Sequence, residues 1–442
     1  MGEGSPPIRY NPSSMNPEAE IRRRIARAGP ITFAEFMDVA LYWPDGGYYS
    51  ASAGDSPTPF GPRGDYYTAP VVHPAFGALL AVQLYQFWLL LDRPTPFHVV
   101  EPGSGNGQLS RDVLAAARGL PEAFSHSLRY LCLDRHPPDT TPGPPPAAAI
   151  AASGLPLRGL RGCILSNELI DAFPVHQVRL VDGRLREVFV TLETAGGPGD
   201  APLVETLADP STPALAARLE ELEITLAEGQ TAEICLDLES WSAAAASALD
   251  QGFVLTIDYG RTADELYSAQ LRPRGALVTY YRHTQTDAPL RRIGQQDITS
   301  QVDFTALVYA GRRAGLDPLG YTTQAQFLRN LDLDRLRRRV TSCPLPVEEG
   351  AANRAGLLAL ARPDGLGDFK VLVQGRNLPC SSDAPPQLWG LSPSPEVRPL
   401  VAALPLPLLS PDHISLPAGW PQPHVQEFDL TDLWSSPFTG DT

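Results

Sequence analysis

Two carboxylates stand three residues apart in the run SNELIDAFPVH, residues 166–176. Glu168 and Asp171 would lie one turn apart if this run is helical. Such a pair can bind a cationic group through charge-assisted hydrogen bonds and accept a proton from it. We therefore predict Glu168 and Asp171 as catalytic residues, together with Asn167 beside them. His176 could relay the proton. The alternative is that Asn167 and Glu168 cap a helix and that His176 is structural.

A glycine-rich turn lies in residues 97–114, FHVVEPGSGNGQLSRDVL. Its glycines are Gly103, Gly105 and Gly107. They let the backbone approach a ligand at the N terminus of a helix. Their spacing is GxGxG, whereas the dinucleotide fingerprint is GxGxxG. Glu101 precedes the glycines, and its charge would disfavour a pyrophosphate and favour a cationic ligand. Asp134 ends the next predicted strand, where a carboxylate can accept hydrogen bonds from ribose hydroxyls.

These features favour S-adenosylmethionine as the cofactor, since it carries a sulfonium, an amino group and a ribose. Methyl transfer from a sulfonium is an in-line displacement, so positioning dominates its catalysis. An arginine acceptor has a pKa above about 12, so no ordinary base deprotonates it beforehand. A carboxylate pair that grips the guanidinium and takes the proton as the bond forms is the simplest solution. The alternative for the glycines is an ordinary tight turn with incidental acids.

Short apolar runs alternate with helical patterns and predict a mostly parallel sheet. The expected strands are residues 97–100, 128–133, 162–165, 252–257 and 369–373, with a helix over 108–118. The predicted class is α/β, with a Rossmann-like class I methyltransferase sheet, a helical N-terminal region and insertions on the substrate side. Asp258 ends one of these strands and should face the same crevice. Tyr280 and Tyr281 lie in an insertion and suggest a recognition loop.

The expected organisation follows the composition along the chain. We predict that residues 1–17 are disordered and that residues 18–96 form an N-terminal helical and loop region over the cofactor. The methyltransferase domain should span residues 97–376, with insertions at 175–232 and 261–367. Residues 377–442 should form a Pro-rich extension that wraps the surface. Asp182 and Gly183 favour a hairpin inside the first insertion. The Arg-rich residues 18–28 fit an amphipathic helix, with a mitochondrial presequence as the alternative.

The composition excludes several classes of binding partner. The 442 residues carry a formal net charge of −15 without a basic run, which argues against nucleic acid and anionic membranes. The apolar stretch 76–91 is too short to span a bilayer and carries Gln83 and Gln86, so we expect a buried helix. The five cysteines lack CxxC spacing and the histidines lack HExxH, which predicts no disulfide framework and no metal. We expect a bacterial cytoplasmic protein that could form a homo-oligomer.

The motifs together resemble the MidA-type methyltransferases, a family whose mitochondrial member is a complex I assembly factor that methylates arginine in a protein subunit. The matching strings are GPITFAEFM, GGYY, GDYYTAP, EPGSGNG, SNELIDAFPVH, LTIDYG, RGALVTYYRH, GQQDITSQVDF, TTQAQFL and GDFKVLVQG. They span roughly residues 20–376 in order. The family often has His where Gln301 stands, and the extension after residue 376 has no recognised counterpart.

This resemblance implies a cofactor site that adds Gly64, Asp65 and Tyr67 to the glycine turn. It also implies S-adenosylmethionine as cofactor and an arginine-bearing protein as substrate. Two alternatives stay open. One is methylation of a small molecule or of another protein side chain, and the other is a non-catalytic assembly chaperone that retains the cofactor site.

Overall fold

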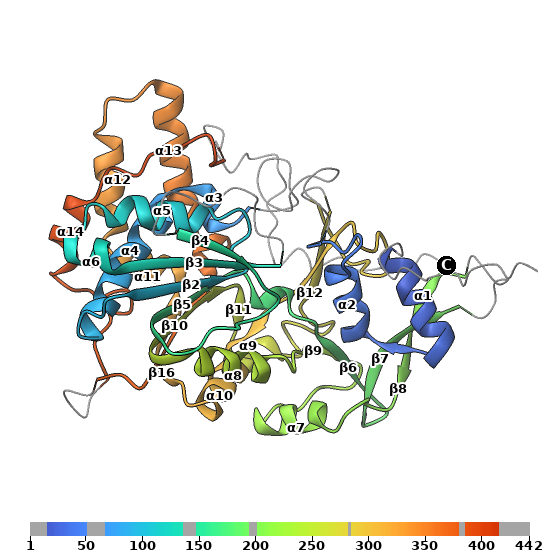
Figure 1. Cartoon of the computed structure of the whole chain (residues 1–442). Helices are drawn as coiled ribbons and strands as arrows, with labels where there is room; N and C mark the ends of the chain where they lie inside the picture. Colours follow the sequence, from blue (N-terminus) through green and yellow to red (C-terminus); the bar gives the residue numbers. More distant parts are fainter. Residues whose placement is uncertain are drawn as a thin grey trace, which may run out of the picture.

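A computed structural model describes residues 16–50, 67–135, 147–193, 201–281, 284–379 and 385–414. Two larger β-sheets lie side by side, the main one at the left of Figure 1 and a smaller one at the right. The predicted cofactor residues Gly64 and Asp65 lie outside the described residues. The main sheet and its helices position the candidate site, and the smaller sheet borders it.

The main sheet has seven strands. In spatial order they are β16 (Asp317–Thr323), β17 (Lys370–Arg376), β10 (Leu249–Asp258), β5 (Leu160–Asn167), β2 (Phe97–Pro102), β3 (Leu128–Asp134) and β4 (Ala147–Ala151). Strands β10, β5, β2, β3 and β4 pair in parallel, and only β17 runs antiparallel to its two neighbours. The predicted α/β class with a mostly parallel sheet is confirmed.

The order of the strands reverses at β2. The chain passes from β2 to β3 and β4 on one side, and then returns to β5 on the other side. At such a switch point the loops after neighbouring strands diverge and leave a crevice at the carboxyl ends. The glycine turn follows β2 and the Glu168 segment follows β5, so both predicted motifs meet at this crevice.

Helices cover both faces of the main sheet (Figure 1). On one face, Val99 and Leu255 pack against α4 (Ala75–Leu90), α5 (Gln108–Ala117) and α6 (Glu122–Ser127). The other face buries Val100 and Val254 with α8 (Leu238–Ala248) and α10 (Phe304–Arg313), and α7 (Ala214–Glu221) extends the same core below the smaller sheet. Alternate residues of one strand therefore enter opposite cores, which explains why these strands are apolar throughout.

Helix α4 is the buried helix expected at residues 76–91, and its two glutamines have specific partners. Gln83 and Gln86 are buried, and their side chains accept hydrogen bonds of 2.8 Å from the backbone N–H groups of Gly390 and Trp389. The longer described part of the C-terminal extension, residues 385–414, thus packs into the core. Its helix α14 (Val397–Ala403) buries Val397 and Val401. The expectation of a surface-wrapping extension does not hold for this part.

The smaller sheet arises mainly from the first predicted insertion. Its strands are β1 (Ile31–Thr32), β7 (Arg184–Leu192), β6 (His176–Val181) and β9 (Thr231–Ile234), with β8 (Leu203–Ala208) beside β7. Asp182 and Gly183 have positive φ of 50° and 68° and form the predicted hairpin turn between β6 and β7. Helices α1 (Pro17–Ala28) and α2 (Phe33–Tyr42) pack on this sheet and bury Ile21, Phe36 and Val190.

The remaining elements lie mostly between residues 260 and 368. They are α3 (Ala69–Val72), η2 (Ile170–Ala172), β11 (Gly260–Arg261), α9 (Ala263–Leu266), β12 (Leu277–Tyr281), β13 (Thr284–Thr286), β14 (Asp297–Ser300), β15 (Val302–Asp303), α11 (Gln324–Asn330), α12 (Leu333–Thr341), α13 (Val347–Ala359) and η3 (Leu366–Asp368). The segment 261–367, predicted as one insertion, also contains the main-sheet strand β16.

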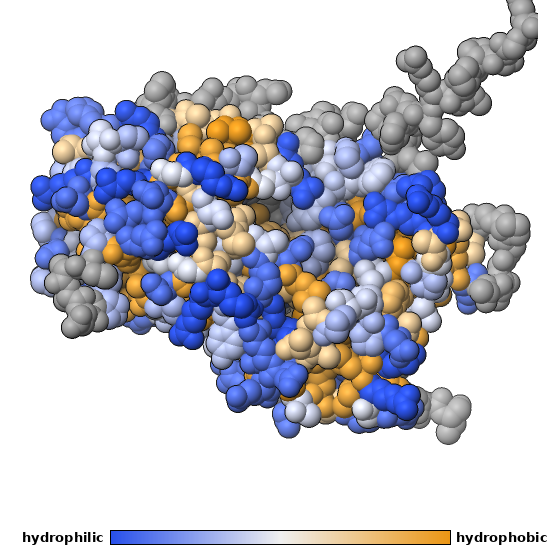
Figure 2. Space-filling view, turned by 60° about the horizontal axis from the view of Figure 1, so that its bottom comes forward, coloured by the Kyte–Doolittle hydropathy of each residue, from blue (hydrophilic) through white to orange (hydrophobic). Residues whose placement is uncertain are grey.

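No helix within the described ranges is long and apolar enough to cross a membrane. Figure 2 shows hydrophilic side chains over much of one face, with apolar side chains gathered in smaller patches.

Candidate active site

The glycine turn is a compact loop fixed to the end of β3. Gly103, Gly105 and Gly107 all have positive φ, between 52° and 72°, a conformation that side chains with a Cβ disfavour. The Asp134 carboxylate accepts a hydrogen bond of 3.0 Å from the Gly105 N–H. The structure therefore brings the two predicted parts of the cofactor site, the glycines and the acid after β3, into direct contact.

Ser104 lies in this turn and carries a polar atom that is unsatisfied within the described part of the chain. Its hydroxyl oxygen is buried and has no hydrogen-bond partner among the described residues. Such an orphaned polar atom is uncommon in a folded protein and is expected where a ligand binds. The turn also lies against the segment after β5, because a Cβ built on Gly103 would stand 2.8 Å from Leu169 Cδ1. The predicted cofactor and catalytic segments are thus adjacent.

Glu101 lies beneath the turn and is 5% exposed. Tyr130 donates a hydrogen bond of 2.8 Å to its carboxylate. Burial raises the pKa of Glu101 to about 8, and the nearby charge of Asp134 acts in the same direction. A cationic ligand would lower this pKa again, so Glu101 suits a site for a positively charged cofactor. Tyr67, the remaining predicted cofactor residue, packs at the border of the main core just before α3.

Glu168 follows the last residue of β5 and adopts a positive φ of 51°, which is rare for a residue with a long side chain. Its N–H donates to the Ile257 carbonyl at 2.9 Å, and its Oε1 accepts from Asn167 Nδ2 at 2.9 Å and from the Ala69 N–H at 3.2 Å. Burial and the charge of Asp171 raise its pKa to about 8. The side chain binds distant α3, so it is not the cap of the helix that follows.

Asp258 holds the turn that follows Glu168. It is fully buried at the end of β10, and its Oδ2 accepts from the N–H groups of Leu169 at 3.2 Å and Ile170 at 2.9 Å. A third, longer contact of 3.4 Å comes from the Asp171 N–H. These bonds satisfy the start of η2, which has no side-chain cap of its own. Asp258 therefore acts on the geometry of the turn.

Asp171 points toward β14. Its Oδ2 accepts from Thr299 Oγ1 at 3.0 Å, and Thr299 in turn contacts the Tyr259 hydroxyl. Its Oδ1 is buried and has no hydrogen-bond partner among the described residues. Burial raises the pKa of Asp171 to about 6. The same turn thus carries two carboxylates of raised pKa, one of them with an unused acceptor oxygen.

Aromatic side chains from the N-terminal region border this turn. Tyr42 donates to the Ala172 carbonyl at 2.8 Å, and the Arg135 guanidinium lies 4.2 Å from the centre of its ring. Tyr49 stacks on Tyr42 and donates to Asp297 Oδ1 at 2.9 Å. Sequence reasoning did not assign Tyr42 or Tyr49 to the site. For Tyr49 the signal was the GGYY run, residues 46–49, which is unusually aromatic for a linker.

His176 lies apart from this cluster. It is on β6 in the smaller sheet, and its Nδ1 is 2.7 Å from the buried Glu187 carboxylate. The structure therefore places the predicted proton relay in a hydrogen bond within the smaller sheet. Asn167, by contrast, contacts Glu168 directly and has a buried Oδ1 without a partner among the described residues.

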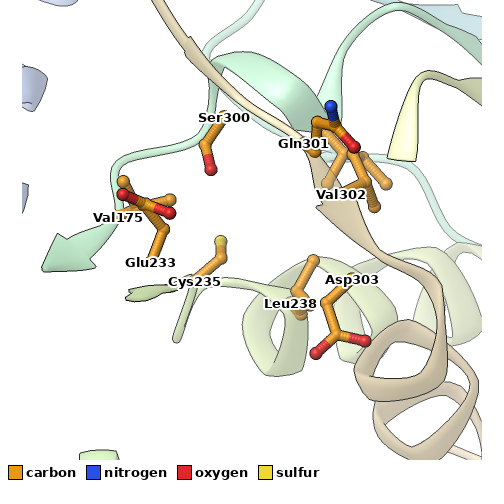
Figure 3. A pocket seen from close by; sticks show the side chains of 9 residues that line it. Val175, Glu233, Cys235, Leu238, Ser300, Gln301, Val302 and Asp303 are labelled. Carbon is orange, nitrogen blue, oxygen red and sulfur yellow. The ribbon is translucent and has the colours of Figure 1, made fainter. Parts of the chain in front are cut away.

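A small pocket lies behind η2, between the smaller sheet and β14 (Figure 3). Its lining residues are Ile170, Val175, Glu233, Cys235, Leu238, Ser300, Gln301, Val302 and Asp303. Ser300 is directed toward Glu233 and Cys235 in Figure 3. None of the predicted catalytic or cofactor residues lines this pocket, but Ile170, in the turn between Glu168 and Asp171, does. Within the described part of the chain, no group of three His, Cys, Asp or Glu could hold a metal ion.

The sheet order, the glycine turn after β2 and the acid after β3 define an S-adenosylmethionine-dependent methyltransferase of the Rossmann-like type. Residues 79–138 and 151–322 match the family described as "Putative S-adenosyl-L-methionine-dependent methyltransferase", and the chain belongs to this family.

The solved structures and curated relatives agree with this assignment. A crystal structure of a superfamily member from Burkholderia thailandensis, bound to S-adenosyl-homocysteine, superposes with a TM-score of 0.70 at 28% identity and covers 86% of this chain and 97% of its own. The mitochondrial protein arginine methyltransferase NDUFAF7 homolog of Drosophila melanogaster is 27% identical over 80% of this chain and 83% of its own length. Human NDUFAF7 is 27% identical over 70% of this chain and 72% of its own. The predicted MidA-type relationship and S-adenosylmethionine as cofactor are thereby confirmed.

Proposed function

We propose that this methyltransferase transfers its methyl group to an arginine side chain of a protein substrate. The observation that carries the proposal is the crowding of Glu168, Asp171 and Asp258 at one turn. Burial is the main reason why the pKa values of these carboxyls rise, and the charge of Asp171 adds repulsion at Glu168 and Asp258. A bound guanidinium would relieve this repulsion and return the carboxyls to their ionised form.

The shape of the cluster suits such a cation. Asp171 offers an unused buried acceptor, and both described hydrogen bonds to Glu168 go to Oε1. A guanidinium has five donors in a planar fork and matches two carboxylates better than a lysine ammonium does. Tyr42 and Tyr49 lie next to the turn, where aromatic faces can pack on a guanidinium. The relatives named protein arginine methyltransferases support the same acceptor.

The proposed division of labour follows from these positions. Glu101, the three glycines, Asp134 and Tyr67 hold the cofactor, and Gly64 and Asp65 belong to the same proposed set. S-adenosylmethionine supplies an electrophilic methyl group and leaves as the neutral thioether. Glu168 and Asp171 orient the guanidinium, and Glu168 accepts the proton that the nitrogen loses as its bond to carbon forms. Asn167 holds Glu168 in place, and we assign no proton transfer to His176.

The test is to identify the labelled residue. The purified protein is incubated with methyl-labelled S-adenosylmethionine and a bacterial lysate, and the labelled peptides are sequenced by mass spectrometry. We expect label on arginine in one or a few proteins, and much less label with the Asp134→Ala variant. Label on lysine, or only on small molecules, would reject the arginine proposal and favour the alternative acceptors.

A further inference from the structure

The C-terminal segment from Leu409 to Ile414 lies between three helices that border the site. Its chain comes from α14 and passes α13 and α5 toward α3 (Figure 1). The Ile414 N–H donates to the Val71 carbonyl of α3 at 2.8 Å. The Leu409 N–H donates to Asn353 Oδ1 of α13 at 3.0 Å. We call residues 409–414 the brace.

His413 makes the central contact of the brace. It is 8% exposed, and its Nε2 lies 3.1 Å from an oxygen of Asp112, which is equally buried on α5. Its Nδ1 accepts a hydrogen bond of 3.1 Å from the Ser410 N–H. A neutral imidazole carries one proton, so this bond leaves the proton on Nε2, where it can donate to Asp112. Gln108 Nε2 lies 3.0 Å from the same Nε2, so His413, Asp112 and Gln108 contact one another directly. His413 is thus held from both sides.

Asp112 connects the brace to the glycine turn. Its other oxygen accepts from Gln108 Nε2 at 3.0 Å, and Gln108 is the first residue of α5. The Gln108 N–H in turn donates to Asn106 Oδ1 at 3.0 Å within the turn. The first turn of α5 supplies the N–H groups that face a ligand in this type of site. The brace therefore fixes the orientation of the cofactor turn through three buried side chains.

The other end of the brace reaches the candidate catalytic carboxylate. Ile414 binds α3 at Val71, and the first residue of that helix, Ala69, donates its N–H to Glu168 Oε1. Helix α3 spans only Ala69–Val72, so an anchor at Val71 restrains Ala69 as well. One short segment thus contacts both the helix of the cofactor turn and the helix that binds Glu168.

We propose that the brace positions the cofactor site and that His413 is its principal positioning residue. This role rests on the assignment of the glycine turn to the cofactor. It gives the C-terminal extension a function in catalysis, although the extension begins more than 200 residues after the turn in the sequence.

The experiment measures the affinity of full-length variants for S-adenosylhomocysteine by calorimetry. The melting temperature of each variant and its KM and kcat for methyl transfer are measured as well. His413→Ala should weaken affinity and raise the KM for S-adenosylmethionine by about tenfold, as expected for the loss of one buried hydrogen bond. His413→Gln should restore most of the affinity, because its Nε2 can donate to Asp112 from a similar place. Leu404→Ala is the matched control, since Leu404 is buried at the end of α14 and its backbone hydrogen bonds go to Leu400 and Arg339.

Leu404→Ala should lower the melting temperature and leave affinity unchanged. Equal affinity losses in His413→Ala and Leu404→Ala, or an unchanged affinity in His413→Ala, would overturn the role of the brace. Should His413→Ala not fold, Asp112→Asn tests the same contact, because Asn has one acceptor oxygen for two donors. Asp134→Ala separates the two hypotheses, since an unchanged affinity in that variant means that the cofactor assignment itself has failed.

Discussion

At the scale of single residues, substitution of Glu168 gives the most direct test of the proposed function. Glu168→Gln keeps the volume and can still accept at Oε1, but it removes the charge and the proton acceptor. Turnover should fall by about 10² to 10⁴, the range for a positioned acid–base group. Affinity for S-adenosylhomocysteine should stay within about twofold, which calorimetry can measure.

The control for this variant is Asp303→Asn. Asp303 is a buried carboxyl whose Oδ1 caps α10 by accepting from the Ala306 N–H, and Asn caps a helix equally well. Asp303 lies outside the Glu168 cluster, so Asp303→Asn should keep its turnover. A fully active Glu168→Gln protein would show that Glu168 only supports the turn.

The raised pKa of Glu168 predicts how the rate depends on pH. Below a pKa of about 8 the carboxyl is mostly protonated and cannot accept the guanidinium proton. The value of kcat/KM should therefore rise by about tenfold per pH unit until it levels off near that pKa. Glu168→Gln should abolish this slope. A rate that is flat from pH 6 to 9 in the wild type would contradict the assignment.

The same shift affects stability, with the opposite trend. The folded-state pKa of Glu168 lies above the ordinary value of 4.5, so its contribution to stability is complete below that value. The contribution is lost as the pH rises through about 8. Glu168→Gln should thus gain stability relative to the wild type between pH 5 and pH 9 in urea unfolding of the cofactor-free protein.

Asp134 tests the cofactor site. Asp134→Ala removes charge-assisted hydrogen bonds worth about 1.5–3 kcal/mol, which corresponds to about ten- to hundredfold weaker binding of the cofactor. Asp134→Asn can still accept a hydrogen bond from the Gly105 N–H. A loss of affinity in this variant therefore reports on the contacts to the cofactor and not on the shape of the glycine turn. Unchanged affinity in both variants would reject the ribose assignment.

Sequence reasoning found the residues that end core strands, because the strand pattern and the acids after it are local. It placed Glu101, Asp134, Glu168 and Asp258 at one edge of the sheet. It could not show that the Asp258 carboxylate accepts hydrogen bonds from the Leu169 and Ile170 N–H groups, since this depends on the spacing between β5 and β10. It also placed His176 near the site, whereas the hairpin carries it into the smaller sheet.

At the scale of elements, two strands of the main sheet escaped prediction for identifiable reasons. Strand β4 has the sequence AAAIA, in which only Ile150 is β-branched. Strand β16 contains Pro318 and Gly320, which are normally disfavoured in strands and mark an irregularity in its pairing with β17. Both are edge strands of the main sheet, where such residues are tolerated. The central strands were predictable because burial on both faces makes them continuously apolar.

The turn between β5 and η2 provides a prediction at this scale. Asp258→Asn leaves one acceptor oxygen and places an NH₂ group among the N–H groups of Leu169, Ile170 and Tyr259. Hydrogen bonds to a charged group are worth about 1.5–3 kcal/mol, so we expect a loss of stability of that order, measured by urea unfolding. Activity should fall with it because Glu168 and Asp171 flank this turn. Wild-type stability would show that the turn holds its shape without Asp258.

At the scale of the whole molecule, the site is assembled from segments that are far apart in the sequence. The main sheet supplies the glycine turn and Glu168, the N-terminal helices supply Tyr42, and the C-terminal segment anchors α3 and α5. Local patterns cannot reveal such contacts, because each segment alone is compatible with many neighbours. The Pro-rich composition after residue 376 suggested a peripheral extension for the same reason.

Removal of the extension tests how far it belongs to the core. Leu388, Trp389, Val397, Val401 and Leu404 are each at most 5% exposed. Burial of one such side chain contributes about 1.5–3 kcal/mol, so their combined loss is comparable to the total stability of a domain, about 5–15 kcal/mol. A chain that ends after Asn377 should therefore be unfolded or aggregated, with no cooperative melting transition and no cofactor binding.

A single substitution separates the loss of this packing from the removal of the whole extension. Trp389→Ala should cost about 3–5 kcal/mol and lower the melting temperature, while the brace keeps its contacts and the folded fraction binds the cofactor with wild-type affinity. Trp389→Phe keeps most of the buried area and the backbone bond to Gln86, so it should be nearly as stable as the wild type. If the truncated chain melts cooperatively near the wild-type temperature, the extension covers a core that is already complete. Its contribution would then be limited to the contacts that His413 and Ile414 make with α5 and α3.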